Sequence, residues 1–220
     1  MSAHGHNDTS ARFLVAIDVD STLIRDEVIE LIADEAGTRN HVAAITERAM
    51  RGEIDFEKSL RERVATLAGL PESVVARVRS RIRLTDGARE LIDGVHRAHG
   101  RIGAVSGGFD EVLEPLAHDL GLDAWCANRL EIVDGRLTGE VLGEVIDAAA
   151  KARTLREWAI RFGVPPQQWV AVGDGANDIL MMGEARLSVA FVAKPRVRNE
   201  ADIVIDRPHL AQVLPLLGLT

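Results

Sequence analysis

Residues 13–22 of the chain read Phe-Leu-Val-Ala-Ile-Asp-Val-Asp-Ser-Thr. The continuous apolar run at 13–17 ends at acidic residues, which is typical of a fully buried β-strand. Similar short apolar runs recur along the chain, at 102–105, 169–172, 189–192 and 203–205. Amphipathic stretches of helical length lie between them, at 86–99, 110–120, 147–162 and 178–185. Strands that alternate with helices of this length predict an α/β fold with a Rossmann-like parallel sheet.

Two segments interrupt this alternation. Residues 26–84 contain no convincing strand and have the pattern of short helices, so we expect a small helical cap domain inserted after the first strand. Residues 130–141 alternate on either side of Asp134-Gly135, a pattern that predicts a β-hairpin appendage. The expected organisation is therefore a flexible N-terminus (1–12), a core built from 13–25 and 85–220, and a cap domain (26–84).

Composition and charge exclude several classes of protein. Hydrophobic residues make up 46% of the chain and charged residues 27%, which is ordinary for a globular protein. The net charge of −8 argues against binding to nucleic acid or to an anionic membrane, because both require a cationic face. No apolar run approaches the ~20 residues of a membrane helix.

Cysteine content and the N-terminal pattern bear on location. Cys126 is the single cysteine, so the chain cannot form an internal disulfide, and residues 1–12 do not have the pattern of a signal peptide. We therefore expect a cytoplasmic protein. The sequence leaves open whether it is a monomer or a homodimer.

Polar residues follow three of the predicted strands at their carboxyl ends. Asp18 and Asp20 follow the first strand, 106–108 (Ser-Gly-Gly) follow the second, and 173–178 (Gly-Asp-Gly-Ala-Asn-Asp) follow the third. The carboxyl ends of parallel strands meet at one edge of a sheet, where ligands of such folds bind. We therefore expect these three segments to form a single site.

The side chains expected at this edge suit a metal ion and a phosphate. Four carboxylates would repel one another there unless a cation lies between them: those of Asp18, Asp20, Asp174 and Asp178. Carboxylates completed by waters and a phosphate describe a Mg²⁺ site. Ser106, with the N–H groups of Gly107 and Gly108 at a helix start, can cradle a phosphate, and Lys151 can add a fixed positive charge.

Each of these features alone has a purely structural explanation. An Asp-x-Asp pair is most often a turn or a helix cap, Ser-Gly-Gly is ordinarily a tight turn, and a single lysine is usually a solvated surface charge. Asn177 would then only cap the helix that follows it. It is their occurrence together, at successive strand ends, that indicates a site.

The same motifs resemble those of the haloacid-dehalogenase-like phosphatases. The matching segments are 18–23, 105–109, Lys151 and 173–178, and the resemblance extends over nearly all of the chain from Phe13 onward. The hairpin segment 134–139 and four residues of the predicted cap further resemble those members that hydrolyse O-phosphoserine: Glu27, Met50, Phe56 and Arg63. The resemblance implies Mg²⁺-dependent hydrolysis of O-phosphoserine to serine and phosphate, the last step of serine biosynthesis.

The resemblance also implies roles for the core residues. Asp18 would be the nucleophile that forms a transient aspartyl-phosphate, and Asp20 the general acid and base. Mg²⁺ would be held by the side chains of Asp18 and Asp174 and by the backbone carbonyl of Asp20, with Asp178 holding a metal-bound water. The remaining core residues would bind or support the substrate: Ser106, Gly107, Gly108, Lys151 and Asn177.

In the predicted cap, the implied roles concern the amino-acid part of the substrate. Arg63 would pair with the carboxylate of phosphoserine and Glu27 with its ammonium group, while Met50 and Phe56 would wall the pocket. Without the resemblance, Met50 and Phe56 would be interpreted as packing residues and Arg63 as part of a solvated helix face.

Two other functions remain open from the sequence. A phosphatase or phosphotransferase of the same fold could act on another small phosphomonoester, although the charges of Glu27 and Arg63 would then be left unpaired. A phospho-receiver-like signalling switch also combines a parallel sheet with an acidic strand end, a hydroxyl residue and a lysine. The cap, and Asp20 placed to hydrolyse the intermediate, argue against a switch.

Overall fold

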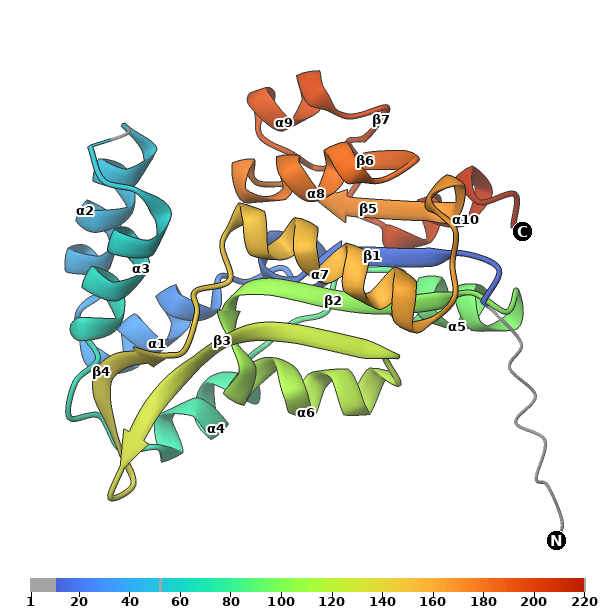
Figure 1. Cartoon of the computed structure of the whole chain (residues 1–220). Coiled ribbons are helices and arrows are strands. Elements are labelled where there is room, and N and C mark those ends of the chain that lie inside the picture. The colour runs from blue at the N-terminus through green and yellow to red at the C-terminus, as the bar shows by residue number, and fades with distance from the viewer. Residues whose placement is uncertain (1–10, 52, 220) are drawn as a thin grey trace, which may run out of the picture.

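The fold is built around β1 (Leu14–Asp18), the first of the predicted strands. A computed structural model describes residues 11–51 and 53–219. Within them a seven-stranded sheet has the order β4-β3-β2-β1-β5-β6-β7 (Figure 1). The other strands are β2 (Arg101–Phe109), β3 (Ala124–Val133), β4 (Arg136–Leu142), β5 (Trp169–Gly173), β6 (Leu187–Phe191) and β7 (Ile203–Ile205). Only β4 runs antiparallel to its neighbour, so the predicted α/β fold with a parallel sheet is confirmed.

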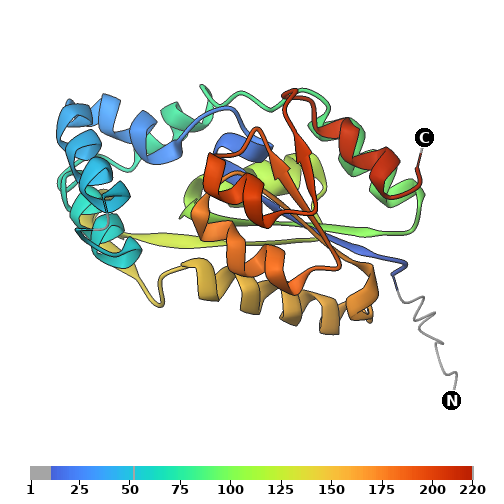
Figure 2. The ribbon, with the colours of Figure 1, turned by 90° about the horizontal axis from the view of Figure 1, so that it is seen from above.

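Alternate residues of β1 face opposite sides of the sheet, and each side is covered by helices. Leu14 and Ala16 pack in a cluster with α7 (Ala148–Arg161) and α8 (Ile179–Glu184). Val15 and Ile17 pack on the other side in a larger cluster. The helices of the core in that cluster are α5 (Ala88–Arg97), α6 (Asp110–Leu120) and α10 (Val213–Leu216). Figure 2 shows the sheet between these two helical layers, which explains why β1 is apolar at every position before Asp18.

A helical segment lies between β1 and α5. It contains α1 (Val28–Ala36), α2 (Arg39–Met50), α3 (Phe56–Ala65) and α4 (Ser73–Arg79). Helices α2 and α3 stand at the end of the molecule opposite to α10 (Figures 1 and 2). That residues 26–84 form a separate cap domain stays a prediction. The flexible N-terminus also stays a prediction, since residues 1–10 lie outside the described part of the chain.

The hairpin at 130–141 is confirmed, and its first strand is longer than predicted. Residues Ala124–Asn128 of β3 pair in parallel with β2, and from Arg129 onward the same strand pairs antiparallel with β4. The hairpin is thus a continuation of the main sheet that extends toward the helical segment, and the Gly69 N–H, in the turn beyond α3, donates to the Leu137 carbonyl of β4 (2.8 Å). The run Ala-Trp-Cys-Ala at 124–127 is apolar and does not alternate, so the hairpin pattern of 130–141 does not extend back to it.

Some helix boundaries also differ from those expected. The helical pattern that begins at Phe56 continues to Ala68 in the sequence, whereas α3 ends at Ala65. Two short helices near the C-terminus, α9 (Pro195–Glu200) and α10, have too few turns to show an amphipathic period. None of the helices in the described residues has the length and apolar content needed to cross a membrane.

The two connections between the helical segment and the sheet run side by side. Ile24 and Leu84 form an antiparallel bridge, and the Arg25 N–H donates to the Arg83 carbonyl (2.9 Å). The buried carboxylate of Asp26 accepts bonds from the Arg83 N–H (2.8 Å) and from the Arg83 Nη2 (2.6 Å). Burial alone would raise the pKa of Asp26, but the bonds from Arg83 outweigh it and lower that pKa. Asp26 therefore joins the entry and the exit of the helical segment.

We predict that Asp26→Asn destabilises the protein by about 1 kcal/mol at pH 7, because the uncharged amide bonds the Arg83 guanidinium more weakly and Arg83 itself is screened by solvent. A lowered folded pKa gives a stabilisation that is complete above the unfolded value of about 3.9 and is lost as the pH falls through the folded value. Urea unfolding of both proteins at pH 7 and at pH 3, below the unfolded pKa, should show this difference shrinking. Asp206→Asn, at an exposed pair with Arg198, is the control and should stay within about 0.5 kcal/mol.

Candidate active site

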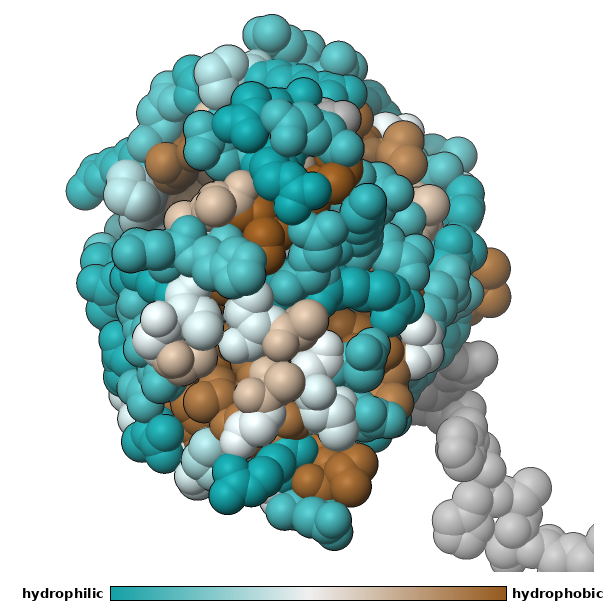
Figure 3. Space-filling view, turned by 90° about the vertical axis from the view of Figure 1, so that its left-hand side faces the viewer, coloured by the Kyte–Doolittle hydropathy of each residue, from teal (hydrophilic) through white to brown (hydrophobic). Residues whose placement is uncertain are grey.

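A cavity of about 460 Å³ lies between the carboxyl ends of the strands and the helices α2 and α3. Figure 3 views the molecule from the side of these helices, where the surface is largely hydrophilic and hydrophobic side chains gather toward the lower part of the view. The cavity is lined from both directions, by acidic and glycine residues of the strand ends and by side chains of the helical segment. Its polar and charged lining residues are Asp18, Asp20, Glu27, Thr46, Ser59, Arg63, Asp174, Asn177 and Lys194.

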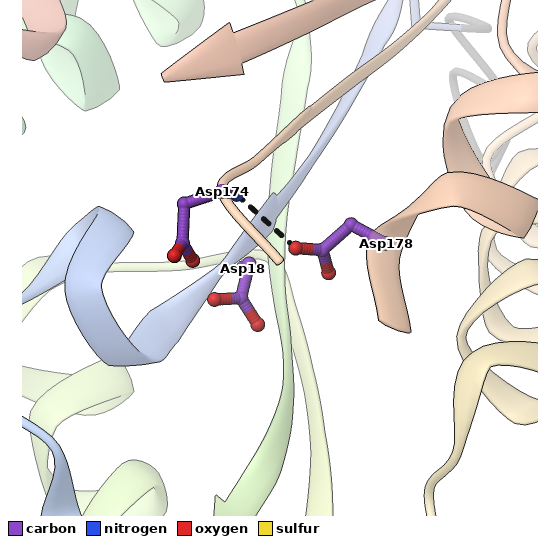
Figure 4. Close-up of side chains that lie close together, drawn as sticks. All are labelled: Asp18, Asp174 and Asp178. Atoms are coloured by element: carbon purple, nitrogen blue, oxygen red, sulfur yellow. Dashed lines mark hydrogen bonds between the residues drawn. The ribbon is translucent and has the colours of Figure 1, made fainter. Parts of the chain in front are cut away.

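Three carboxylates come together where β1 and β5 end. Asp18 closes β1, Asp174 follows β5, and Asp178 follows one turn later; all three are buried. One oxygen atom of each lies within 4.8 Å of an oxygen of the other two (Figure 4). Burial, followed by the charge of Asp178, raises the pKa of Asp18, and the same two causes raise the pKa of Asp174 to about 6. The group is therefore electrostatically unfavourable without a compensating cation.

Lys151 supplies one such cation from α7. Its Nζ donates to Asp178 Oδ1 (2.7 Å) and also to Asp18 Oδ1, and the side chain is completely buried. Burial disfavours the charged amine, but the charges of Asp178 and Asp18 outweigh this effect and raise the pKa of Lys151. Lys151 does not line the cavity itself; it lies behind Asp18 and holds its carboxylate from the interior side.

Asp178 is held by more than the lysine. Its second oxygen, Oδ2, accepts bonds from the backbone N–H groups of Gly175 (2.9 Å) and Asp174 (3.2 Å), the latter drawn as a dashed line in Figure 4. Both oxygens of Asp178 are therefore bonded to the protein. Among the three carboxylates, Asp18 and Asp174 are the two that also line the cavity and could ligate a metal directly.

Asp20 lies two residues beyond Asp18 and faces the same cavity. Its Oδ1 accepts a long bond from the Val28 N–H (3.4 Å) at the start of α1. Burial, followed by the neighbouring charge of Glu27, raises the pKa of Asp20 to about 8. Glu27 is itself oriented by the Ser21 hydroxyl, which donates to its Oε1 (2.7 Å). Ser21 has a left-handed backbone (φ 60°), and this turn brings Asp20 and Glu27 together.

The predicted Ser-Gly-Gly cradle lies at the carboxyl end of β2. The buried Ser106 hydroxyl accepts a bond from the Gly108 N–H (2.8 Å), so this N–H is already bonded to the protein. Gly107 and Gly108 line the cavity, whereas Ser106 does not. A side chain at Gly107 would lie 2.9 Å from the ring of Phe56, and one at Gly108 would lie 2.9 Å from Asp20 Oδ2. A side chain at either position would therefore displace the Phe56 ring or the Asp20 carboxylate.

Of the predicted cap residues, Glu27, Phe56 and Arg63 line the cavity with the strand-end carboxylates. Arg63 is half-buried, and its Nε donates to the Ser59 carbonyl one turn earlier in α3 (3.1 Å). Burial lowers the pKa of Arg63, while the charges of Glu27 and Asp20 oppose that shift. Met50 ends α2, and its side chain lies outside the described part of the structure.

Three further polar residues of the cavity are not predicted from the sequence: Thr46, Ser59 and Lys194. Lys194 follows β6, its backbone N–H donates to the Asp174 carbonyl (3.1 Å), and its Nζ lies 4.0 Å from Asp174 Oδ2. The run at 189–192 does predict the strand, and its carboxyl end belongs to the same edge of the sheet, which is the signal that could have found Lys194. Ser59, inside α3, has no comparable signal in the sequence.

Comparison with known proteins identifies the family. The family model for haloacid dehalogenase-like hydrolases matches residues 15–183. The chain is 57% identical over 210 residues to a phosphoserine phosphatase of Streptomyces coelicolor, covering 96% of this chain but only 51% of that relative. It is 48% identical over 204 residues to a phosphoserine phosphatase of Streptococcus thermophilus, covering 93% of this chain and 95% of the relative.

A solved structure, described as a phospho-aspartyl intermediate analogue of phosphoserine phosphatase, superimposes with a TM-score of 0.88 at 43% identity. The match covers 94% of this chain and 99% of that one. The chain thus spans about half the length of the Streptomyces relative and nearly the whole length of the Streptococcus relative and of the solved structure. On the sequence match, the fold and the shared strand-end motifs, the chain belongs to the haloacid dehalogenase-like hydrolases.

Proposed function

We propose that the protein is a Mg²⁺-dependent phosphatase that hydrolyses O-phosphoserine to serine and phosphate through an aspartyl-phosphate on Asp18, the last step of serine biosynthesis. The observation that carries this proposal is the charge arrangement of the cavity. Several carboxylates suited to phosphoryl transfer line one side of the cavity. Glu27 and Arg63, whose charges are opposite to each other, line the same cavity. Phosphoserine carries an ammonium and a carboxylate that match these two side chains.

The first step is attack by Asp18. A carboxylate oxygen of Asp18 forms a bond to phosphorus, the bond from phosphorus to the serine oxygen breaks, and Asp20 donates its proton to that oxygen. The Lys151 ammonium, bonded to the Asp18 carboxylate, reduces the repulsion between this carboxylate and the anionic substrate. In the second step Asp20 takes a proton from water, which attacks the phosphorus of the aspartyl-phosphate and releases phosphate and Asp18.

The donor set fits a hard divalent cation. Oxygen ligands from Asp18, Asp174 and the Asp20 carbonyl would hold Mg²⁺, because Asp178 has both oxygens bonded to Lys151 and to backbone N–H groups. Bound Mg²⁺ would neutralise charge on the phosphoryl oxygens during transfer. The raised pKa values of Asp18 and Asp174 support a cation here, because they show that two anionic carboxylates are poorly accommodated without one.

The substrate head group would be read by the helical segment. Glu27, fixed by the Ser21 hydroxyl, would accept from the ammonium, and Arg63 would donate to the carboxylate. The ring of Phe56 packs against Gly107 and would separate the phosphate from bulk water on that side. Gly107 and Asn177 line the cavity and would bind phosphate oxygens. Gly108 lines it too, but its N–H is bonded to Ser106, so Gly108 would act, with Ser106, Lys151 and Asp178, by holding its neighbours in place.

Location and assembly belong to the same proposal. A cytoplasmic enzyme acting on a small molecule, without nucleic acid or membrane as a partner, agrees with the net charge of −8. The enzyme would act as a monomer or a homodimer.

Activity should require Mg²⁺. Treatment with a chelator followed by dialysis should abolish release of phosphate from O-phosphoserine, and added Mg²⁺ should restore it. Because a cation that binds only the folded state stabilises it, Mg²⁺ at about 100 times its dissociation constant should add about 2.7 kcal/mol to the free energy of unfolding. Full turnover in excess chelator would remove the metal from the mechanism.

Asp18→Asn should reduce turnover of O-phosphoserine on the order of 10⁴-fold or more, because the near-isosteric amide cannot act as the nucleophile. Phosphate release and mass spectrometry of the acid-quenched enzyme measure the two consequences, loss of rate and loss of the phosphorylated protein. Asp119→Asn, at an exposed position of α6, is the matched control and should keep the parental rate. A variant at Asp18 with near-parental turnover would exclude the covalent route.

Glu27→Gln should lower kcat/KM for O-phosphoserine by about 10- to 150-fold, because the amide keeps the shape but loses a charge-assisted hydrogen bond to the ammonium. A phosphomonoester with the carboxylate but no amino group should be a poor substrate of the parent and nearly unaffected by the substitution. The test is kcat/KM for both esters on both proteins. Equal losses on the two esters would mean that Glu27 supports the fold or the metal site instead of reading the ammonium.

A further inference from the structure

The hydroxyl group of Ser59 is buried and lacks a partner. Ser59 lies in α3, its side chain is 1% exposed, and it lines the cavity. Across residues 11–51 and 53–219, no hydrogen-bond partner of its Oγ is found. A buried hydroxyl without a partner is unfavourable, so a native structure that retains one calls for an explanation.

Other hydroxyl groups of the helical segment do not share this property. Thr46 in α2 donates to the Val42 carbonyl one turn earlier (3.0 Å), and Ser80 at the end of α4 donates to the Arg77 carbonyl (2.7 Å). Such bonds back to the preceding turn are the usual solution for serine and threonine in helices. Ser59 does not make one, and its hydroxyl is therefore available to a group in the cavity.

The neighbours of Ser59 indicate what that group would be. Arg63 lies one turn later on the same face of α3, and its Nε is bonded to the Ser59 carbonyl (3.1 Å). The terminal nitrogens of Arg63 make no ion pair with any carboxylate in the described residues. Phe56, one turn before Ser59, packs toward Gly107. The face of α3 that lines the cavity thus presents, in order, an aromatic ring, an unpaired hydroxyl and an unpaired guanidinium.

We propose that the Ser59 hydroxyl donates a hydrogen bond to the substrate carboxylate that Arg63 holds, and that Ser59 is a specificity-determining residue. This inference rests on the proposed function, because it takes O-phosphoserine as the substrate. The guanidinium offers a planar pair of donors to a carboxylate, which retains lone pairs for a further donor. Ser59 fills that role from a position fixed by α3.

The proposal predicts two effects of Ser59→Ala with opposite signs. In the free protein, alanine removes a buried unpaired hydroxyl, so the melting temperature should rise by about 2–4 °C. In catalysis, alanine removes a bond to a charged group, so KM for O-phosphoserine should rise by about 10-fold or more while kcat stays within about two-fold. A serine that only packs inside the helix would give the first effect without the second.

The experiment compares three phosphomonoesters with saturating Mg²⁺. O-Phosphoserine carries both head groups, 3-phosphooxypropanoate lacks the ammonium, and phosphoethanolamine lacks the carboxylate. Ser59→Ala should lower kcat/KM for the first two esters and leave kcat/KM for phosphoethanolamine unchanged. If an ester is hydrolysed too slowly to give kcat/KM, its inhibition constant for the hydrolysis of O-phosphoserine is measured instead. Ser80→Ala, at an exposed helix end, is the matched control and should change none of the three.

Alanine also favours helix more than serine does, so a thermal shift on its own does not decide the question. The deciding thermal measurement is the rise in melting temperature on adding L-serine, which should be smaller for Ser59→Ala than for the parent. Ethanolamine should give no such difference between the two proteins.

Three results would overturn the inference. The first is an equal fall in kcat/KM for all three esters, the second is a fall only for the esters that carry the ammonium group, and the third is unchanged kinetics for all three. Failure of the proposed function would look different, since the parent protein would then not hydrolyse O-phosphoserine. In that case the substrate assignment of Ser59 falls with it.

Discussion

The buried contact of Lys151 with Asp18 and Asp178 is the interaction on which the site depends. It joins three separate parts of the sheet and its covering helices: the end of β1, the interior of α7 and the turn after β5. The lysine and Asp178 are fully shielded from solvent and Asp18 nearly so, which makes each charge costly unless the others are present. The remaining carboxylates, Asp174 at the cavity and the half-buried Asp20, are arranged around this contact. Removing the lysine would leave two buried carboxylates that repel each other, so the arrangement is fixed by electrostatics as much as by packing.

Most of the core follows from the sequence because its signals are local. The apolar run before Asp18 predicts a strand buried on both faces, and the parallel order then brings Asp18 and Asp174 to one edge without further information. β3 is only partly predictable, because its first residues carry no clean alternation and its pairing changes from parallel to antiparallel along its length. Lys194 escaped prediction because its strand end lacks the acidic and glycine residues that mark the others. The unpaired state of the Ser59 hydroxyl is a property of the folded packing, and no sequence pattern encodes it.

The helical segment brings a different set of charges to the same cavity. Glu27, just before α1, and Arg63, in α3, belong to the helical segment, whose two chain connections to the sheet run side by side around Asp26 and Arg83. The Ser21 turn and the Asp26 carboxylate both lie in the connection between β1 and α1. The position of Glu27 relative to Asp20 is therefore set within a few residues of β1. Arg63 is more distant along the chain and is placed by α3, whose packing on β4 ties it back to the sheet through the hairpin. The two charged side chains that would read an amino-acid head are therefore anchored by independent routes.

The same features that fit the cavity for chemistry work against the stability of the protein. Raised pKa values at Asp18, Asp20 and Asp174 mean that the folded state disfavours their ionised forms, so each carboxylate contributes less stability, or an unfavourable amount, as the pH rises past its unfolded value. The unpaired hydroxyl of Ser59 adds an unfavourable term of another kind. Both costs disappear if a cation lies among the carboxylates and an anionic head group lies against α3. A protein that were only a scaffold would gain by replacing these residues with apolar ones, as in the rest of its core. Their presence together at one cavity is explained if the folded state is completed by a metal and a substrate.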